Sequence, residues 1–173
     1  MSDQKIYIKN AYTLVLSKLN YEFSNTNILL EAITHKSISK VNYERLEFLG
    51  DAVIQLIITE YLYKKYPDHQ EGHLSREKQA IVSKKVLSNI SINIGLPNIL
   101  RSNNLAIESN DSLKESLSTD LMESIIGAIF LDSDYRQCEK IILKTFGEYL
   151  DSIEIVGQKD AKTLLQEYMQ SIG

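Results

Sequence analysis

The chain has 173 residues, 43% of them hydrophobic, which is enough for one domain with a proper core. Its single cysteine, Cys138, excludes an internal disulfide and favours a reducing, cytoplasmic compartment, and neither a long apolar run nor an apolar N-terminal signal indicates a membrane span or secretion. The formal net charge of −4 argues mildly against a nucleic-acid partner, an objection that weakens if divalent cations neutralise several carboxylates.

The first two helices are predicted from the spacing of apolar residues. Residues 6–19 carry a helical pattern, and a second helix is expected over 27–35 with Ser24 or Asn25 as its N-cap. A cationic pair closes this second helix, where it is expected to interact with the C-terminal carbonyls: His35 and Lys36.

The third helix, expected from about Tyr43 to Tyr66, combines an apolar body with an acidic head. Residues 52–58 are apolar almost all round, so burial on most sides is expected. Three acids at the head are spaced i, i+3 and i+7, which places them on one face: Glu44, Glu47 and Asp51. Attraction to the helix dipole would explain Glu44 and extend at most to Glu47, whereas Asp51 lies two turns into the helix. Because unpaired carboxylates at the edge of a core are costly, a bound metal ion is the favoured explanation.

A turn over 68–73 leads into one long helix, expected over 74–94. The turn contains His69, Glu71 and His73 in alternation, without the i, i+4 histidine pair of zinc peptidases, so both histidines are interpreted as turn residues. The helix also carries a basic cluster that fits equally well with a solvated face or with phosphate contact: Arg76, Lys78, Lys84 and Lys85.

A second helix with acids follows a helix stop at 95–97 and a polar loop at 101–112. Its core ladder has apolar residues at intervals of four: Leu113, Leu117, Leu121, Ile125 and Ile129. A neighbouring face carries Asp120, Glu123 and Gly127, again spaced i, i+3 and i+7. Gly127 has no helix-propensity reason to be there, and it predicts close approach of another helix. Two buried helices with acids in register offer the hard oxygen ligands that a divalent cation needs.

The last part of the sequence predicts a core helix over 134–150, a linker at 157–159 and an amphipathic helix at 161–172. A lone helix cannot bury an apolar stripe, so this final helix is expected to dock on the body or a partner, or to open a second domain. No strand alternation of any length and no internal repeat is found. The main body is therefore predicted to be all-α.

The order of these motifs resembles the ribonuclease III family. Residues 44–53 (ERLEFLGDAV) match the family's signature segment residue for residue. Further matching blocks follow the family order: 34–37 (THKS), 71–75 (EGHLS) and 120–132 (DLMESIIGAIFLD). The sequence departs from the family pattern at 109–112, which lacks the usual Gly-Gly, and at 118–119, where Ser-Thr replaces a pair of small residues.

The resemblance implies a compact, multi-helix endonuclease domain over residues 1–156 that forms a homodimer and cuts double-stranded RNA. Ribosomal RNA precursors would be typical substrates. Residues 157–173 would form a linker and the first helix of a truncated double-stranded-RNA-binding domain. No membrane partner is implied.

The resemblance also implies roles for individual residues. The family's Mg²⁺ ligands, which also accept Mn²⁺, match Glu47, Asp51, Asp120 and Glu123. Two further acids of the cleavage centre, nearer the substrate, match Glu44 and Glu71. Phe48 matches the residue that plugs into the partner subunit. No other cofactor is implied.

Two alternatives remain open. A non-catalytic double-stranded-RNA-binding or dimerisation module with the same fold would be expected to have lost acids, and all six are present. Another all-α metal phosphohydrolase, acting on nucleotides, would explain the acids and the negative charge but not Phe48 or the Glu71-Gly72 block.

Overall fold

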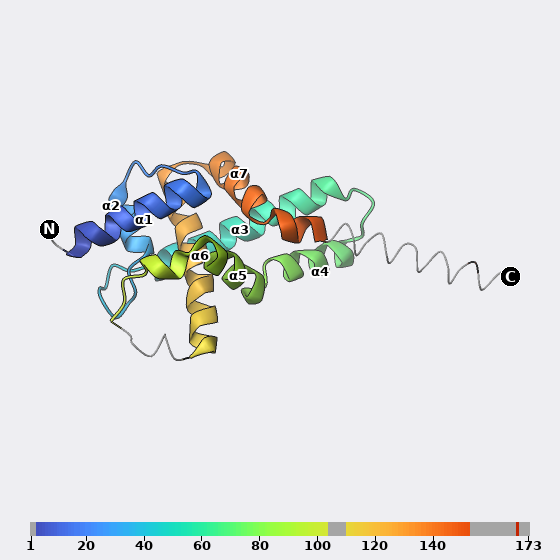
Figure 1. The fold of residues 1–173 in the computed structure, drawn as a ribbon. Coiled ribbons are helices and arrows are strands. Elements are labelled where there is room, and N and C mark those ends of the chain that lie inside the picture. Colours follow the sequence, from blue (N-terminus) through green and yellow to red (C-terminus); the bar gives the residue numbers. More distant parts are fainter. Residues whose placement is uncertain (1–2, 104–109, 153–168, 170–173) are drawn as a thin grey trace.

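The structure is a computed structural model that describes residues 3–103, 110–152 and 169 (Figure 1). Within these ranges the extended pairing is limited to an isolated bridge between Thr34 and Arg101, so the predicted all-α fold is confirmed. No described helix is long and apolar enough to cross a membrane. The helices follow in this order: α1 (Asp3–Leu19), α2 (Thr26–Ala32), α3 (Glu44–Lys65), α4 (Glu71–Ile81), α5 (Lys84–Ile94), the 3₁₀ helix η1 (Leu96–Ile99), α6 (Asp111–Asp132) and α7 (Tyr135–Thr145).

Helices α3 and α6 cross at the centre of the domain and pack more extensively than any other pair of described helices (Figure 1). Two glycines permit this crossing. A Cβ atom on Gly50 would overlap the carbonyl oxygen of Glu123, and one on Gly127 would overlap the carbonyl oxygen of Leu46. The close approach predicted for Gly127 is therefore confirmed, and Gly50 is its counterpart on α3.

Helix α6 is the most deeply enclosed element of the crossing. Every residue from 117 to 129 is buried except Asp120. Helices α2, α5 and α7 also pack against α6, and the Ser124 hydroxyl donates a 2.8 Å hydrogen bond to the carbonyl oxygen of Ala32 at the end of α2. An acid on this helix is consequently held in a rigid setting.

Helix α3 is less buried than its apolar pattern predicted. Four residues of its apolar segment are buried, but Leu56 is 58% exposed. Phe48 is 81% exposed and Tyr63 is 72% exposed. Spacings of eight and fifteen residues bring these three side chains to the same side of a helix. The prediction of burial on most sides is wrong for this face, because no described element covers it.

Helix α2 ends at Ala32, three residues before the predicted end. Beyond it the backbone pairs with a distant segment: Arg101 N donates to the Ile33 carbonyl at 2.8 Å, and His35 N donates to the Arg101 carbonyl at 2.9 Å. These bonds replace the next helical turn. The interpretation of His35 and Lys36 as partners of the helix dipole is therefore wrong.

The helix predicted over 74–94 is in fact two helices, α4 and α5, separated at Ser83. Ser83 has an extended backbone (φ −67°, ψ 149°), and its hydroxyl donates to the Ala80 carbonyl at 2.9 Å. Serine side chains compete with the helical backbone in this way. The break allows the apolar residues of α5 to face α6, while α4 packs against α3.

The remaining predictions for the C-terminal half concern Cys138, α7 and the chain end. Cys138 is fully buried, as expected for a small apolar side chain, and burial raises the pKa of its thiol to about 12. Asp134 caps α7 by accepting from Gln137 N at 2.9 Å, and residues 147–152 are helical again after a turn. The linker and final helix predicted over 157–173 lie outside the described residues, apart from residue 169.

Candidate active site

Three of the six predicted acids converge where α3 and α6 cross. Glu47, Asp120 and Glu123 each offer a carboxylate oxygen, and these oxygens lie within 4.8 Å of one another. Glu47 lies about one turn before Gly50, and Glu123 lies one turn before Gly127. The glycines that let the helices touch thus also bring the acids together. We call these three residues the acid cluster.

Burial and mutual repulsion oppose ionisation of the acid cluster. Glu123 is 9% exposed, and burial, followed by the charges of Asp51, Glu47 and Asp120, raises its pKa to about 8. Burial, followed by the charges of Asp120 and Glu44, raises the pKa of Glu47 to about 7. Clustered carboxyl groups with raised pKa values indicate a site that needs a proton or a cation for neutrality.

Asp120 interacts with neighbours that are distant in sequence. The Tyr43 hydroxyl donates to Asp120 Oδ2 at 3.4 Å, a long and therefore weak hydrogen bond. Burial raises the pKa of Asp120, while the bond from Tyr43 and the positive charges of Lys84 and Lys36 oppose the rise. These three partners were not predicted, because no local spacing in the sequence connects them to Asp120.

Asp51 borders the acid cluster. Gln55 Nε2, one turn further along α3, donates to both of its carboxylate oxygens at 2.9 Å. After burial, the charge of Asp51 is the largest cause of the raised pKa of Glu123, so the two carboxylates lie within electrostatic reach. The Gln55 contact was overlooked, although i, i+4 pairs of this kind are recognisable in sequence. The role of Asp51 as a metal ligand stays a prediction.

The two acids predicted to lie nearer the substrate are placed differently from each other. Glu44, the first residue of α3, accepts from Lys36 Nζ at 2.9 Å, and this ion pair is exposed. Glu71, the first residue of α4, is exposed and accepts from Ser75 Oγ at 2.6 Å. Among the described residues, Glu71 is not part of the acid cluster. The roles of both acids stay predictions.

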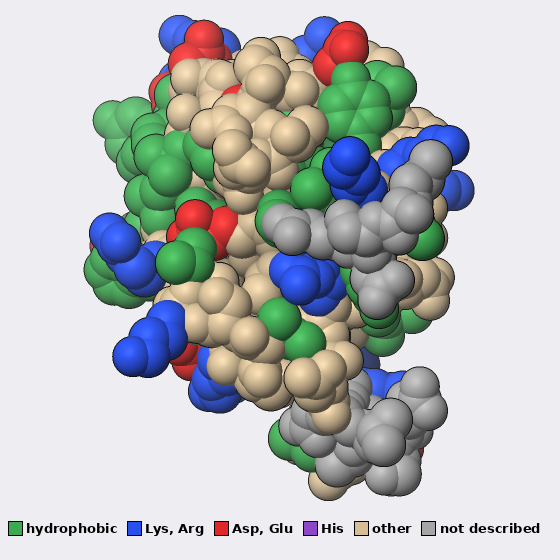
Figure 2. All heavy atoms as spheres, turned by 90° about the vertical axis from the view of Figure 1, so that its left-hand side faces the viewer, with side chains coloured by type: hydrophobic (Ala, Val, Ile, Leu, Met, Phe, Trp, Pro, Cys, Tyr) green, Lys and Arg blue, Asp and Glu red, His purple; other side chains and the backbone are tan. Residues whose placement is uncertain are grey.

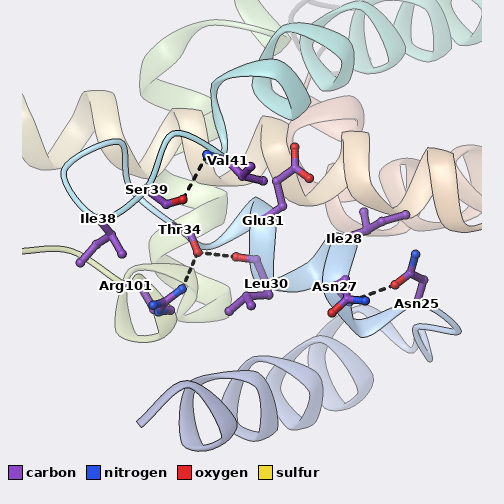
Figure 3. A pocket seen from close by; sticks show the side chains of 10 residues that line it. All are labelled: Asn25, Asn27, Ile28, Leu30, Glu31, Thr34, Ile38, Ser39, Val41 and Arg101. Carbon is purple, nitrogen blue, oxygen red and sulfur yellow. Dashed lines mark hydrogen bonds between the residues drawn. The ribbon is translucent and has the colours of Figure 1, made fainter. Parts of the chain in front are cut away.

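A hollow of about 650 Å³ lies between α2 and the loop at 37–43 (Figure 3). The Arg101 guanidinium points toward this hollow and donates to the Thr34 hydroxyl at 3.0 Å, and that hydroxyl donates to the Leu30 carbonyl at 2.6 Å. The arginine therefore supports the bridge between 34 and 101. None of the ten residues that line the hollow is one of the six acids.

Sequence comparison places these residues in a family. A family model described as Ribonuclease-III-like matches residues 25–150, a range that contains all six acids. Ribonuclease 3 of Shewanella piezotolerans is 42% identical over 152 residues, which cover 88% of this chain and 68% of that protein. The chain belongs to the ribonuclease III family. Ribonuclease 3 of Acinetobacter baumannii is likewise 42% identical over 160 residues, covering 91% of this chain and 70% of that protein.

Solved structures agree with membership of the ribonuclease III family. The nuclease domain of ribonuclease III from Campylobacter jejuni superposes with a TM-score of 0.72 at 37% identity, covering 79% of this chain and 96% of that chain. Dicer from Giardia intestinalis shares the fold, with a TM-score of 0.65 at 21% identity over 81% of this chain and 19% of that chain. The family inferred from sequence motifs is thus confirmed.

The raised pKa values predict that the stability of this ribonuclease III-family chain depends on pH. Folding raises the pKa of Glu123 to about 8 and that of Glu47 to about 7, both from an ordinary value of 4.5. Between pH 4.5 and 8 the folded protein therefore binds more protons than the unfolded chain, and the free energy of unfolding falls as the pH rises. Without metal, we expect the Tm to fall by several degrees between pH 6 and 8.5.

Thermal unfolding with and without Mg²⁺ checks this expectation. Mg²⁺ should raise the Tm more at pH 8.5 than at pH 6, because at the lower pH it must displace protons. The Glu123→Gln variant should show a flatter pH dependence without metal, whereas Glu115→Gln, on the exposed side of α6, should behave as the wild type. Identical slopes in all three proteins would contradict the assignment of the slope to the acid cluster.

Proposed function

We propose that this chain is a Mg²⁺-dependent endoribonuclease that hydrolyses phosphodiester bonds in double-stranded RNA. One observation carries the proposal: Glu47, Asp120 and Glu123 extend from two crossing helices and bring their oxygens within 4.8 Å. The relatives named Ribonuclease 3 support the same reaction class.

The acid cluster has the donor set that Mg²⁺ prefers. Carboxylates at a partly buried edge can replace some of its waters while leaving positions for water and for phosphate oxygens. We assign Glu47, Asp120 and Glu123 as ligands, with Asp51 as the fourth. Mn²⁺, which also favours oxygen ligands, is expected to substitute. The bound ion would supply a Lewis acid for the phosphodiester and lower the pKa of an attacking water.

The protein itself contributes by holding the negatively charged carboxylates of the acid cluster in fixed positions. Helices α3 and α6 hold the ligands rigidly, so little reorganisation is needed when an ion binds. Glu44 and Glu71 are proposed as further acids of the cleavage centre, nearer the substrate. An RNA duplex presents phosphates and 2′-hydroxyls to such a surface, and recognising it by shape requires no groove that reads bases.

The wider assignments follow from the family. We propose residues 1–156 as the endonuclease domain, and 157–173 as a linker and the first helix of a double-stranded-RNA-binding domain; the family match over 25–150 supports the first assignment. Ribosomal RNA precursors are proposed as substrates, and the cytoplasm as the location.

We also propose that the chain acts as a homodimer. Its exposed apolar face on α3 contains Phe48, Leu56 and Tyr63, which are 81%, 58% and 72% exposed. Three large apolar side chains on one face of a central helix indicate a surface that another protein covers. The related Campylobacter jejuni structure is described as showing flexibility in a region involved in dimer formation. A twofold contact through α3 would use Phe48 from both copies.

Replacing Phe48 with Ala is expected to weaken the dimer about thirtyfold or more, because truncating a central aromatic at an interface costs about 2 kcal/mol or more. Sedimentation equilibrium measures the dissociation constant. Ile92→Ala is the matched control, since Ile92 is an apolar residue of α5 that is 51% exposed. A wild-type chain that sediments as a monomer, or a Phe48→Ala variant that dimerises normally, would contradict the contact.

The decisive experiment for the function incubates the protein with a long RNA duplex and Mg²⁺. We expect shortened duplex products, their absence after chelation, and restoration by added Mg²⁺. Binding of the duplex without cleavage would favour a non-catalytic module. Turnover of nucleoside triphosphates in place of duplex cleavage would favour a nucleotide phosphohydrolase.

A further inference from the structure

We propose that Lys36 and Lys84 are substrate-binding residues that flank the acid cluster and hold RNA phosphates over it. The inference rests on the proposed function, and it assigns one member of the basic cluster at 76–85 to phosphate contact. The sequence alone left the role of Lys84 open and indicated none of this kind for Lys36, which precedes α3, whereas Lys84 begins α5.

Lys36 approaches the acids from the segment after α2. Its Nζ atom lies 2.9 Å from Glu44 Oε1, and its side chain is 61% exposed. Its charge also acts on Glu47 and Asp120, lowering the pKa of each against the effect of burial. The ammonium group therefore lies at the rim of the acid cluster, and Glu44 holds it there in the absence of RNA.

Lys84 approaches from the other neighbour of α6. Lys84 is the first residue of α5, and its backbone carbonyl accepts a 3.1 Å hydrogen bond from the Thr119 hydroxyl. This bond fixes the backbone of Lys84 next to the residue that precedes Asp120. Thr119 is one of the positions where the chain departs from the family pattern. The charge of Lys84 acts on Asp120 and Glu123. Its side chain is exposed, which leaves the ammonium group accessible to a ligand.

Charge balance gives the two lysines a function. When ionised, the five carboxylates at or beside the site carry five negative charges: Glu44, Glu47, Asp51, Asp120 and Glu123. The two lysines reduce the total to three negative charges, and a pair of divalent cations, common in phosphodiester hydrolysis, leaves one positive charge. One phosphodiester neutralises it. Without the lysines, the metal-loaded site would be negative before the phosphate arrived.

The net charge of the chain and the face shown in Figure 2 offer an RNA backbone little general attraction. The formal net charge is −4, and on the face shown in Figure 2 the Lys and Arg side chains are scattered among apolar and acidic ones rather than gathered into one band. Attraction for a phosphate backbone normally comes from such a band. Lysines placed beside the site therefore make a larger relative contribution in this chain.

The test compares Lys36→Gln and Lys84→Gln with Lys40→Gln and Lys85→Gln, which remove exposed lysines from the same loop and the same helix. Duplex cleavage gives KM, kcat and their salt dependence. Calorimetry measures Mg²⁺ binding to the RNA-free proteins. Each site variant should raise the KM about fivefold. Each should also reduce the slope of log(1/KM) against log salt concentration by about 1 per lysine. Each should also bind Mg²⁺ about twofold or more tighter, because a repelling charge is gone.

Loss of a phosphate contact should weaken RNA binding and strengthen Mg²⁺ binding, whereas damage to the fold would weaken both. Lys→Arg should restore the KM at either position, since a guanidinium also binds phosphate. The proposal is overturned if the site variants match their controls, or if RNA and Mg²⁺ affinity fall together. If either outcome is found but the wild-type protein cleaves the RNA duplex, the proposed function still stands. A wild-type protein that cleaves no duplex overturns the function itself.

Discussion

Replacing Glu123 with Gln is expected to lower the rate of duplex cleavage by about a thousandfold or more while duplex binding stays measurable. Glu123 is 9% exposed and shares the acid cluster with Glu47 and Asp120. The amide keeps the volume of the carboxyl group but offers the ion no charge. A loss of about 4 kcal/mol of transition-state stabilisation, a reasonable value for one charged ligand, corresponds to this factor.

The same variant should fold at least as well as the wild type. Burial and three neighbouring carboxylates raise the pKa of Glu123 to about 8, so a neutral side chain relieves repulsion above that pH. The single-turnover cleavage rate should therefore fall while the Tm stays the same or rises. Replacing a residue with a merely structural role would lower both. Glu115→Gln, an exposed acid on the same helix, is the control. Full activity in Glu123→Gln would remove this residue from the metal site.

The acid cluster could be predicted in large part because helical spacing is a local property. The i, i+3, i+7 spacing placed Glu47 and Asp51 on one face of α3, and Asp120 and Glu123 on one face of α6, without knowledge of how the helices pack. Gly127 then predicted a close crossing, because a glycine in a core helix is otherwise unfavourable. The structure brings three of these acids together and leaves Asp51 hydrogen-bonded to Gln55.

The errors arose where a long-range contact decides the local structure. Nothing near His35 and Lys36 indicates that Arg101 pairs with the backbone there and ends α2 early. Ser83 interrupts a helical pattern of the right period, because its two halves pack against different helices. The exposed face of α3 was predicted to be buried, since the same apolar residues fit a core or an interface. Only the packing of the whole chain distinguishes these cases.

Replacing Gly127 with Ala is expected to destabilise the protein by about 3 kcal/mol or more and to abolish Mg²⁺ binding. Helix propensity alone predicts the opposite sign, since alanine is favoured over glycine inside a helix by about 1 kcal/mol. The new Cβ, however, would overlap the carbonyl oxygen of Leu46 and lie 3.1 Å from the backbone nitrogen of Gly50. A backbone atom in a helix cannot move aside as the end of a side chain can, so α3 and α6 must separate.

Gly147→Ala is the matched control, because a Cβ at Gly147 would meet nothing within 4 Å, and it should leave stability unchanged or slightly increased. Urea unfolding gives the stabilities, and calorimetry gives Mg²⁺ affinity under conditions where Gly127→Ala remains folded. Glu47 and Glu123 lie within about one turn of the crossing glycines, so separating the helices also separates their carboxylates. A folded Gly127→Ala variant that bound Mg²⁺ normally would show that the helix crossing does not set the geometry of the acid cluster.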